Sequence, residues 1–262
     1  GVQTCALPIL VFIDDLNKIN ITKVIIDGNV VAENGVLTTE IAEYNYPEDA
    51  MNSMHIKEEI TPKSFDILAE GKDKVNARVI EIIPARVGTY ERHIELEVKD
   101  GKVQCDVSKD VLKAAVFERH HETGKVGYGF VKGFGIKGGA MAATVAHDAH
   151  NLLVVGTNDE DMALAANTLV ECGGGMVAVK DGKVLGLVPL PIAGLMSDRP
   201  LAEMAEKVEG LDKAWKEIGC DIVSPFMTMA LIPLACLPEL RLTNRGLVDC
   251  TKFELVPLFV EE

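Results

Sequence analysis

The chain has 262 residues and a formal net charge of −14, and 48% of its residues are apolar, 25% charged and only 5% aromatic. This composition is typical of a globular protein with an aliphatic core and excludes an intrinsically disordered chain. The acidic balance argues against nucleic-acid binding, and no apolar run reaches the roughly 18 residues of a membrane span.

The first residues of the chain do not fit the pattern of the residues after them. Residues 1–9 lack an initiator Met and are predicted to be a non-native leader. Residues 10–40 carry β-branched runs around an Asp-Gly turn at 27–28, which predicts a small β unit of two or three strands. Residues 41–63 are polar and show no period, so they are predicted to be a linker.

The main domain is expected at 64–262, where strand and helix patterns alternate. Strand patterns occupy 79–84, 94–98, 103–107, 152–156, 176–179 and 184–187. Residues 111–119 suit a strand or a short helix. The βαβ regularity of a doubly wound sheet is not sustained, so the predicted fold class is α+β, or mixed α/β, and strand-rich.

Two helices are predicted in this domain. The first follows Thr157-Asn158, which cap it, and has three acids in its first turn. The second runs from about 200 to 218. Its predicted apolar face comprises Leu201, Met204, Val208, Leu211 and Trp215. Ser197 or Asp198, after a proline-rich run, is expected to cap it.

The polar cluster at 147–151 is the most informative chemical feature. His147, Asp148, His150 and Asn151 lie within five residues, between two apolar segments. Buried polar groups need partners, so this cluster is interpreted either as a functional site or as a hydrogen-bonded structural turn. A metal site is the weaker interpretation, because no third ligand is identified locally.

Two further segments are candidate sites. Glu118 and His120 lie in a Glu-Arg-His-His run, interpreted as a polar loop or as a partner of the first cluster. The glycine-rich residues 133–139 lack the Gly-Lys-Ser/Thr ending of a phosphate-binding loop, so a tight structural loop is the preferred interpretation.

Several long motifs together resemble those of one known family. They lie at 133–140 (GFGIKGGA), 144–151 (TVAHDAHN), 155–163 (VGTNDEDMA), 190–197 (LPIAGLMS), 238–243 (PELRLT) and 246–249 (GLVD). In this order they resemble the C-terminal domain of the bacterial adenine deaminases of the amidohydrolase superfamily. The resemblance implies a small β-sandwich, of which residues 10–40 would form part, and a C-terminal domain over 64–262. The family's catalytic barrel would be absent from this chain.

The resemblance also implies an activity. Adenine deaminases hydrolyse adenine to hypoxanthine and ammonia with a metal-activated water, usually on Mn²⁺ or Fe²⁺, in purine salvage. The family's metal ligands precede residue 10, so no metal is expected in this chain and it is predicted to be inactive alone. The residues expected to line the substrate pocket, or to support the residues that line it, are His147, Asp148, His150, Asn151, Glu118 and His120.

Two alternatives remain open beside the deaminase. One is a self-contained His/Asp metal hydrolase built from residues 118–151. The other is a non-catalytic accessory or oligomerisation domain. The expected partner is adenine, with no nucleic acid and no membrane, and with a homo-oligomer as an open option. Six scattered cysteines without CxxC spacing indicate free thiols and a cytoplasmic protein.

Overall fold

The computed structural model describes residues 9–261, which belong to two compact units, residues 1–45 and 46–262. Most of the predicted leader, residues 1–8, lies outside the described part of the chain, and Ile9 already belongs to the first strand.

The first unit contains a four-stranded antiparallel sheet in chain order. Its strands are β1 (Ile9–Asp15), β2 (Asn20–Ile26), β3 (Asn29–Glu33) and β4 (Val36–Leu37). Asp27 and Gly28 both have positive φ, as the predicted tight turn requires. Many apolar side chains of this sheet stay about half exposed, because four short strands have too little surface to enclose a core.

The second unit is built around a nine-stranded sheet with the order β13-β12-β10-β11-β8-β9-β5-β6-β7. Its strands are β5 (Lys74–Ile82), β6 (Thr89–Lys99), β7 (Lys102–Val103), β8 (Val111–Phe117), β9 (Val126–Lys132), β10 (Ala140–Ala143), β11 (Leu152–Gly156), β12 (Gly175–Lys180) and β13 (Lys183–Pro189). Only β5 and β9 pair in parallel among these described strands. The strand-rich α+β prediction is confirmed, and residues 9–261 contain no (β/α)8 barrel.

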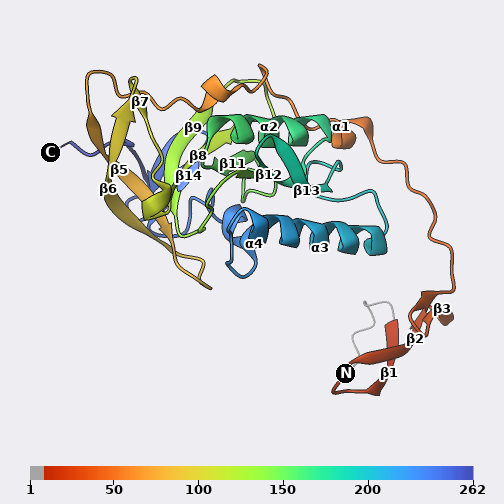
Figure 1. The fold of residues 1–262 in the computed structure, drawn as a ribbon. Helices are drawn as coiled ribbons and strands as arrows, with labels where there is room; N and C mark the ends of the chain where they lie inside the picture. The colour runs from red at the N-terminus through yellow and green to blue at the C-terminus, as the bar shows by residue number, and fades with distance from the viewer. Residues whose placement is uncertain (1–8, 262) are drawn as a thin grey trace. The chain divides into compact units, whose positions relative to one another are not determined.

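Helices and a small sheet cover the two faces of this large sheet (Figure 1). One face packs against α2 (Asp159–Glu171) and the 3₁₀ turn η1 (Pro62–Phe65). The other face packs against α3 (Leu201–Glu217), α4 (Pro225–Ala230) and the three strands β14 (Leu240–Thr243), β15 (Gly246–Asp249) and β16 (Glu254–Val256). The large sheet is therefore the middle of three layers.

Local sequence explains several of these elements. All seven residues of β8 are buried, as expected for a strand covered on both faces, and this resolves the strand-or-helix ambiguity at 111–119. The cap predicted for α2 is confirmed, because Asn158 Oδ1 accepts a hydrogen bond from the Asp161 N–H at 2.8 Å.

The segment predicted as a linker differs from expectation. Residues 46–63 belong to the second unit and include the helical turn α1 (Glu48–Met51). Ile60 is only 3% exposed, and Phe65 packs edge-on against Phe117 with ring centroids 5.4 Å apart. One buried side chain does not create a periodic hydrophobic pattern, so the sequence could not show that this segment packs on the second unit. The boundary at residues 45–46 therefore depends on tertiary packing.

Helix α3 buries less of its predicted face than expected. Leu211 and Trp215 are buried, but Leu201 is 85% exposed and Val208 is 37% exposed. The predicted cap is wrong, because Pro200 is the N-cap and no side chain caps the helix. The predicted strand at 103–107 is shortened to β7, because Asp106 caps a 3₁₀ turn over Val107–Lys109.

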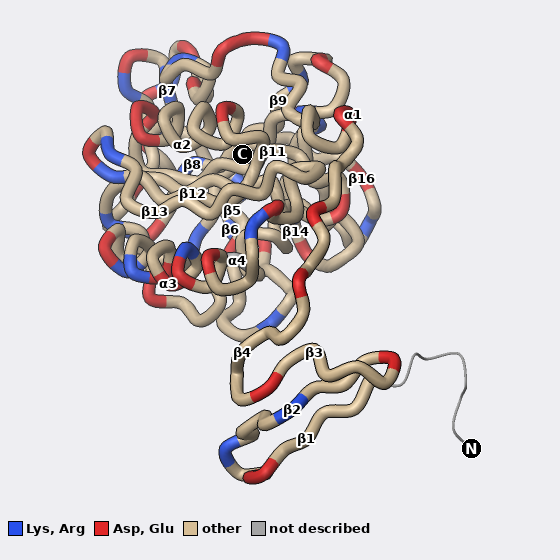
Figure 2. The backbone as a smooth tube through the Cα atoms, turned by 90° about the vertical axis from the view of Figure 1, so that its right-hand side faces the viewer, with Lys and Arg blue, Asp and Glu red and all other residues tan. Residues whose placement is uncertain are grey.

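Charged residues are interspersed around the second unit, as Figure 2 shows. None of the helices in the described part of the chain is long and apolar enough to cross a membrane.

Candidate functional site

The large sheet brings the two histidine-containing candidate segments and the family motif at 190–197 to one of its ends. Phe117 of β8 pairs with Leu152 and with Val126, so residues 118–125 and 144–151 leave the sheet side by side. Gly175 pairs with Pro189 at the same end, where residues 190–197 begin. We call the loops 118–125, 144–151 and 190–197 the histidine end.

The glycine-rich segment lies at the opposite end of the same strands. Ala140, which follows it, pairs with Gly156 and Val179, a strand length away from the histidine end. The Gly133 and Gly135 N–H groups donate to the Asp110 carboxylate, both at 2.9 Å. Because these donors are already occupied, the segment is a tight structural loop and does not cradle a phosphate.

Glu118 acts as the cap of its own turn. Its carboxylate accepts hydrogen bonds from the N–H groups of His120, His121 and Thr123 and from the Thr123 hydroxyl, at 2.6–3.1 Å. Burial alone would raise the pKa of Glu118, but the Thr123 hydroxyl and the three N–H groups together lower it to about 2. The carboxylate is therefore committed to the turn and has no capacity left for general acid or base work at neutral pH.

The histidines at this end are close together but face different partners. His120 Nε2 donates to the Ala149 carbonyl at 2.7 Å, which ties the two loops to each other. The His147 and His150 rings meet edge to face with centroids 5.4 Å apart. His147 also donates its backbone N–H to the Ala230 carbonyl at 2.9 Å, so the cluster is anchored to α4.

His150 is the least satisfied residue of the cluster. Its Nδ1 atom is buried and has no hydrogen-bond partner among the described residues. Burial lowers the pKa of His150, the charges of His147 and Arg119 lower it further, and Asp148 opposes them. The ring is therefore favoured as a neutral imidazole, and its buried Nδ1 is left without a partner.

The other two residues of the cluster, Asn151 and Asp148, have different environments. Asn151 is 4% exposed, and its Oδ1 accepts the Arg119 backbone N–H at 3.3 Å, so it is structural. Asp148 is exposed and lines a pocket of about 650 Å³ with Ala149 and residues of β14, β15 and β16. The expectation that four polar groups of this cluster are buried is therefore wrong for Asp148.

Sequence reasoning missed the residue that organises this end. Arg119 is 1% exposed and donates to three separate segments through its guanidinium. One feature of the sequence could have revealed this burial: Arg119 comes two residues after a strand of seven buried residues. Because Arg119 lies in a run of charged and polar residues, the sequence instead favours a surface loop.

Neither a metal centre nor a compact catalytic constellation forms here. Among residues 9–261, no three or more His, Cys, Asp and Glu side chains are arranged to hold a metal ion. The pocket that Asp148 lines contains none of His120, His147 and His150. This geometry does not support the self-contained hydrolase.

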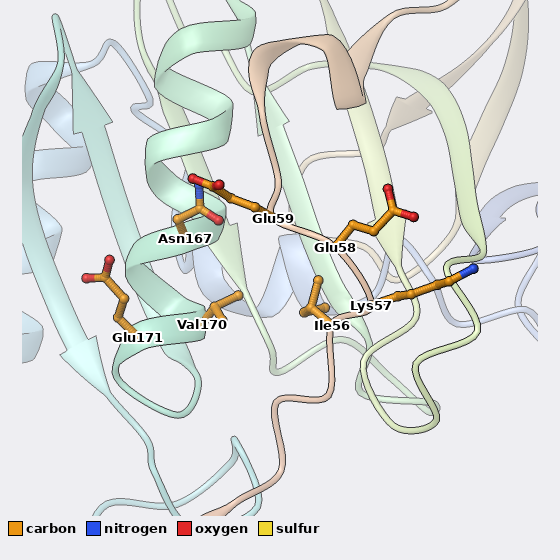
Figure 3. Close-up of a pocket in the computed structure, with 7 residues that line it drawn as sticks. All are labelled: Ile56, Lys57, Glu58, Glu59, Asn167, Val170 and Glu171. Atoms are coloured by element: carbon orange, nitrogen blue, oxygen red, sulfur yellow. The ribbon is translucent and has the colours of Figure 1, made fainter.

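A second pocket, of about 380 Å³, lies where residues 56–59 pass α2. Figure 3 shows Glu59 and Asn167 side by side, while Glu58 and Lys57 point the other way. Asn167 Nδ2 donates to the Ile60 carbonyl at 2.7 Å, so this pocket is a packing seam that fastens the segment to the helix.

Comparison with known proteins finds similarity to adenine deaminases. Residues 86–254 match the family model described as "Adenine deaminase C-terminal domain". The chain is 83% identical over 253 residues to an adenine deaminase of Clostridium botulinum (strain Langeland), covering 97% of this chain and 42% of that protein. It is 55% identical to an adenine deaminase of Moorella thermoacetica, covering 95% of the chain and again 42% of the relative. The chain thus spans less than half the length of these relatives.

Proposed function

The chain belongs to the adenine deaminase C-terminal domain family, and from this premise we propose that it is one module of a protein that hydrolyses adenine to hypoxanthine and ammonia. The single observation that carries the proposal is the 83% identity to a relative named adenine deaminase across nearly the whole chain. In this reaction one water molecule replaces the exocyclic amino group, which leaves as ammonia.

The chemistry of the donor set argues against a metal on this module. Mn²⁺ or Fe²⁺ would supply a Lewis acid that activates water, but it needs several convergent protein ligands. Residues 9–261 do not offer three such ligands together. We propose that the ligands belong to the larger part of the relatives that this chain does not match, and we assign no catalytic step to a metal here.

Ammonia release tests this proposal. The purified chain and the full-length C. botulinum relative would be incubated with adenine, each with and without added Mn²⁺. We expect ammonia and hypoxanthine from the relative and none from the chain. Metal-dependent ammonia release by the chain alone would overturn the proposal that the metal ligands lie outside this chain.

We further propose that the histidine end faces the catalytic part of the full-length protein. Residues 46–60, through which the chain enters the second unit, run along this end, where the His55 N–H donates to the Arg119 carbonyl and the Ala193 N–H to the Ala50 carbonyl. The 650 Å³ pocket beside Asp148 exposes two apolar side chains, Phe253 and Leu255, which is typical of a surface that contacts other protein.

At this end, we propose that His150 supports the substrate pocket of the full-length protein, because its buried Nδ1 has no hydrogen-bond partner among the described residues. The test is a chimera in which this chain replaces the matched segment of the C. botulinum relative. We expect His150→Ala to lower kcat/KM about tenfold, the scale of one lost hydrogen bond near the reacting group, without a change in Tm. His93→Ala is the matched control, because His93 pairs with Glu91 on β6. Unchanged kcat and KM in His150→Ala would leave the cluster a purely structural role.

Location and assembly complete the proposal. The five cysteines in the described part of the chain are all free thiols, which supports a reducing cytoplasm. Homo-oligomerisation is proposed for the full-length protein, and light scattering of the chimera and of the chain alone tests which part carries it.

A further inference from the structure

Arg119 is a buried cation that makes no direct ion pair within residues 9–261, although the neighbouring Glu118 carboxylate favours its charge. Its guanidinium is satisfied by neutral acceptors alone: Nε donates to the His150 carbonyl at 2.6 Å, Nη1 to the Ser53 carbonyl and hydroxyl at 2.7 and 3.1 Å, and Nη2 to the Ala193 carbonyl at 2.9 Å. Burying a charge is costly unless each donor is used, and burial lowers the pKa of Arg119 to about 10. Arg241 is held in a similar way by backbone carbonyls, and what distinguishes Arg119 is that one of its acceptors is the carbonyl of His150.

The space around this guanidinium is closed. A Cβ on Gly194 would lie 2.8 Å from Arg119 Nη2, and Gly194 has a φ of +70°. The Gly194 carbonyl accepts the Thr144 hydroxyl at 2.6 Å, so the turn that receives Arg119 is itself fixed to the segment after β10. The guanidinium therefore has one position in which all its acceptors are met.

The three acceptor segments are far apart in the chain, and the Arg119 guanidinium bonds to all of them at once. Ser53 lies in the entering segment, His150 in the cluster loop and Ala193 in the loop after β13. A planar fork of five N–H donors can bridge three segments at once, which the single ammonium of lysine does not do with the same geometry. The bond to the His150 carbonyl fixes the residue whose ring has the unused nitrogen.

We propose that Arg119 positions His150, holding its turn against the entering segment and the 190–197 loop so that the imidazole keeps one orientation. This inference rests on the proposed function for its purpose, although its geometry does not depend on it. The charged and titratable groups that face His150 are His147, Arg119, Asp148 and His120. Among these groups Arg119 is a permanent cation, and its charge disfavours the imidazolium form of His150.

Histidine proton resonances of this chain, followed by NMR across pH, test the inference without any deaminase activity. We expect His150 to titrate below its ordinary value, and Arg119→Gln to move that titration upward by roughly half a pH unit. Arg119→Lys keeps the charge but loses the fork, so the His150 ring should adopt more than one environment while its titration shifts less. His93, which pairs with Glu91, is the internal control and should not move.

A merely structural role predicts a different pattern. Leu211→Ala removes a buried side chain of α3 that does not contact Arg119, so it should lower the free energy of unfolding. It should leave the His150 titration unchanged. If Arg119→Gln does not fold, Gly194→Ala takes its place, because the added methyl pushes the guanidinium away from its acceptors. An unchanged His150 titration in the Arg119 or Gly194 variant overturns the inference.

Activity separates this inference from the proposed function. In the chimera, Arg119→Lys should reduce kcat/KM by the same factor as His150→Ala, and the double variant should lose no more. If His150 responds to Arg119 in the NMR titration while His150→Ala keeps full activity, the proposed role of His150 fails and the positioning by Arg119 stands.

Discussion

Replacing Glu118 with glutamine tests whether this carboxylate is a turn cap. A fall of its pKa from 4.5 to about 2 corresponds to about 3 kcal/mol of stability at neutral pH. The turn lies near the surface, where solvent screens part of this, so we expect Glu118→Gln to cost about 2 kcal/mol at pH 7. The glutamine keeps one acceptor oxygen but loses the charge that strengthens all four hydrogen bonds.

The pH dependence gives this prediction its sign. Because the folded pKa is depressed, the stabilisation is complete above the unfolded value of 4.5 and is lost as the pH falls towards 2. The difference between the wild-type chain and the variant should therefore shrink to roughly 1 kcal/mol at pH 3. Asp106 and Asp249, whose pKa values are also lowered to about 2, titrate in both proteins and cancel from the difference.

Urea denaturation at pH 7 and pH 3 measures both values, followed by the fluorescence of the buried Trp215. Glu122→Gln, in the same turn but exposed and uninvolved in the cap, is the matched control and should cost little at either pH. An equal loss at the two pH values, or none at pH 7, would refute the assignment of Glu118 as an ionised cap.

Three further predictions concern stability. Asn158→Ala removes the cap of α2 and should cost about 1 kcal/mol in urea denaturation, whereas an unchanged midpoint would contradict the cap. Gly127→Ala would drive a Cβ into the Thr243 carbonyl, so we expect a loss above about 3 kcal/mol, with a large fall in Tm, and a wild-type Tm would show that β14 does not lie against β9. In α3, Gly210→Ala has open space and should stabilise by up to about 1 kcal/mol, while Leu211→Ala should cost about 2–5 kcal/mol, and similar effects of the two would contradict the orientation of the helix.

Local chemistry made part of this structure predictable. The Asp-Gly turn at 27–28, the capped start of α2 and the strand pattern at 94–98, which lies within β6, each depend on residues within a few positions of one another and are found where the sequence placed them. The order of the family motifs carried the relationship to adenine deaminases, which the 83% identical relative supports. The residues that cause each of these features are neighbours in the sequence, so the sequence alone is enough to predict them.

Long-range contacts decided the rest. The sequence shows His147 and His150 as a cluster, but the Arg119 fork that fastens this cluster reaches back 66 residues to Ser53 and forward 74 residues to Ala193. Glu118 is a candidate partner of the histidines by sequence, whereas in the folded chain four donors of its own turn occupy it. Ile60 likewise is fastened to a helix residue 107 positions away. A sequence specifies which groups must find partners, but only the folded chain determines which distant groups those partners are, because burial and hydrogen bonding are satisfied in space and leave no period along the chain.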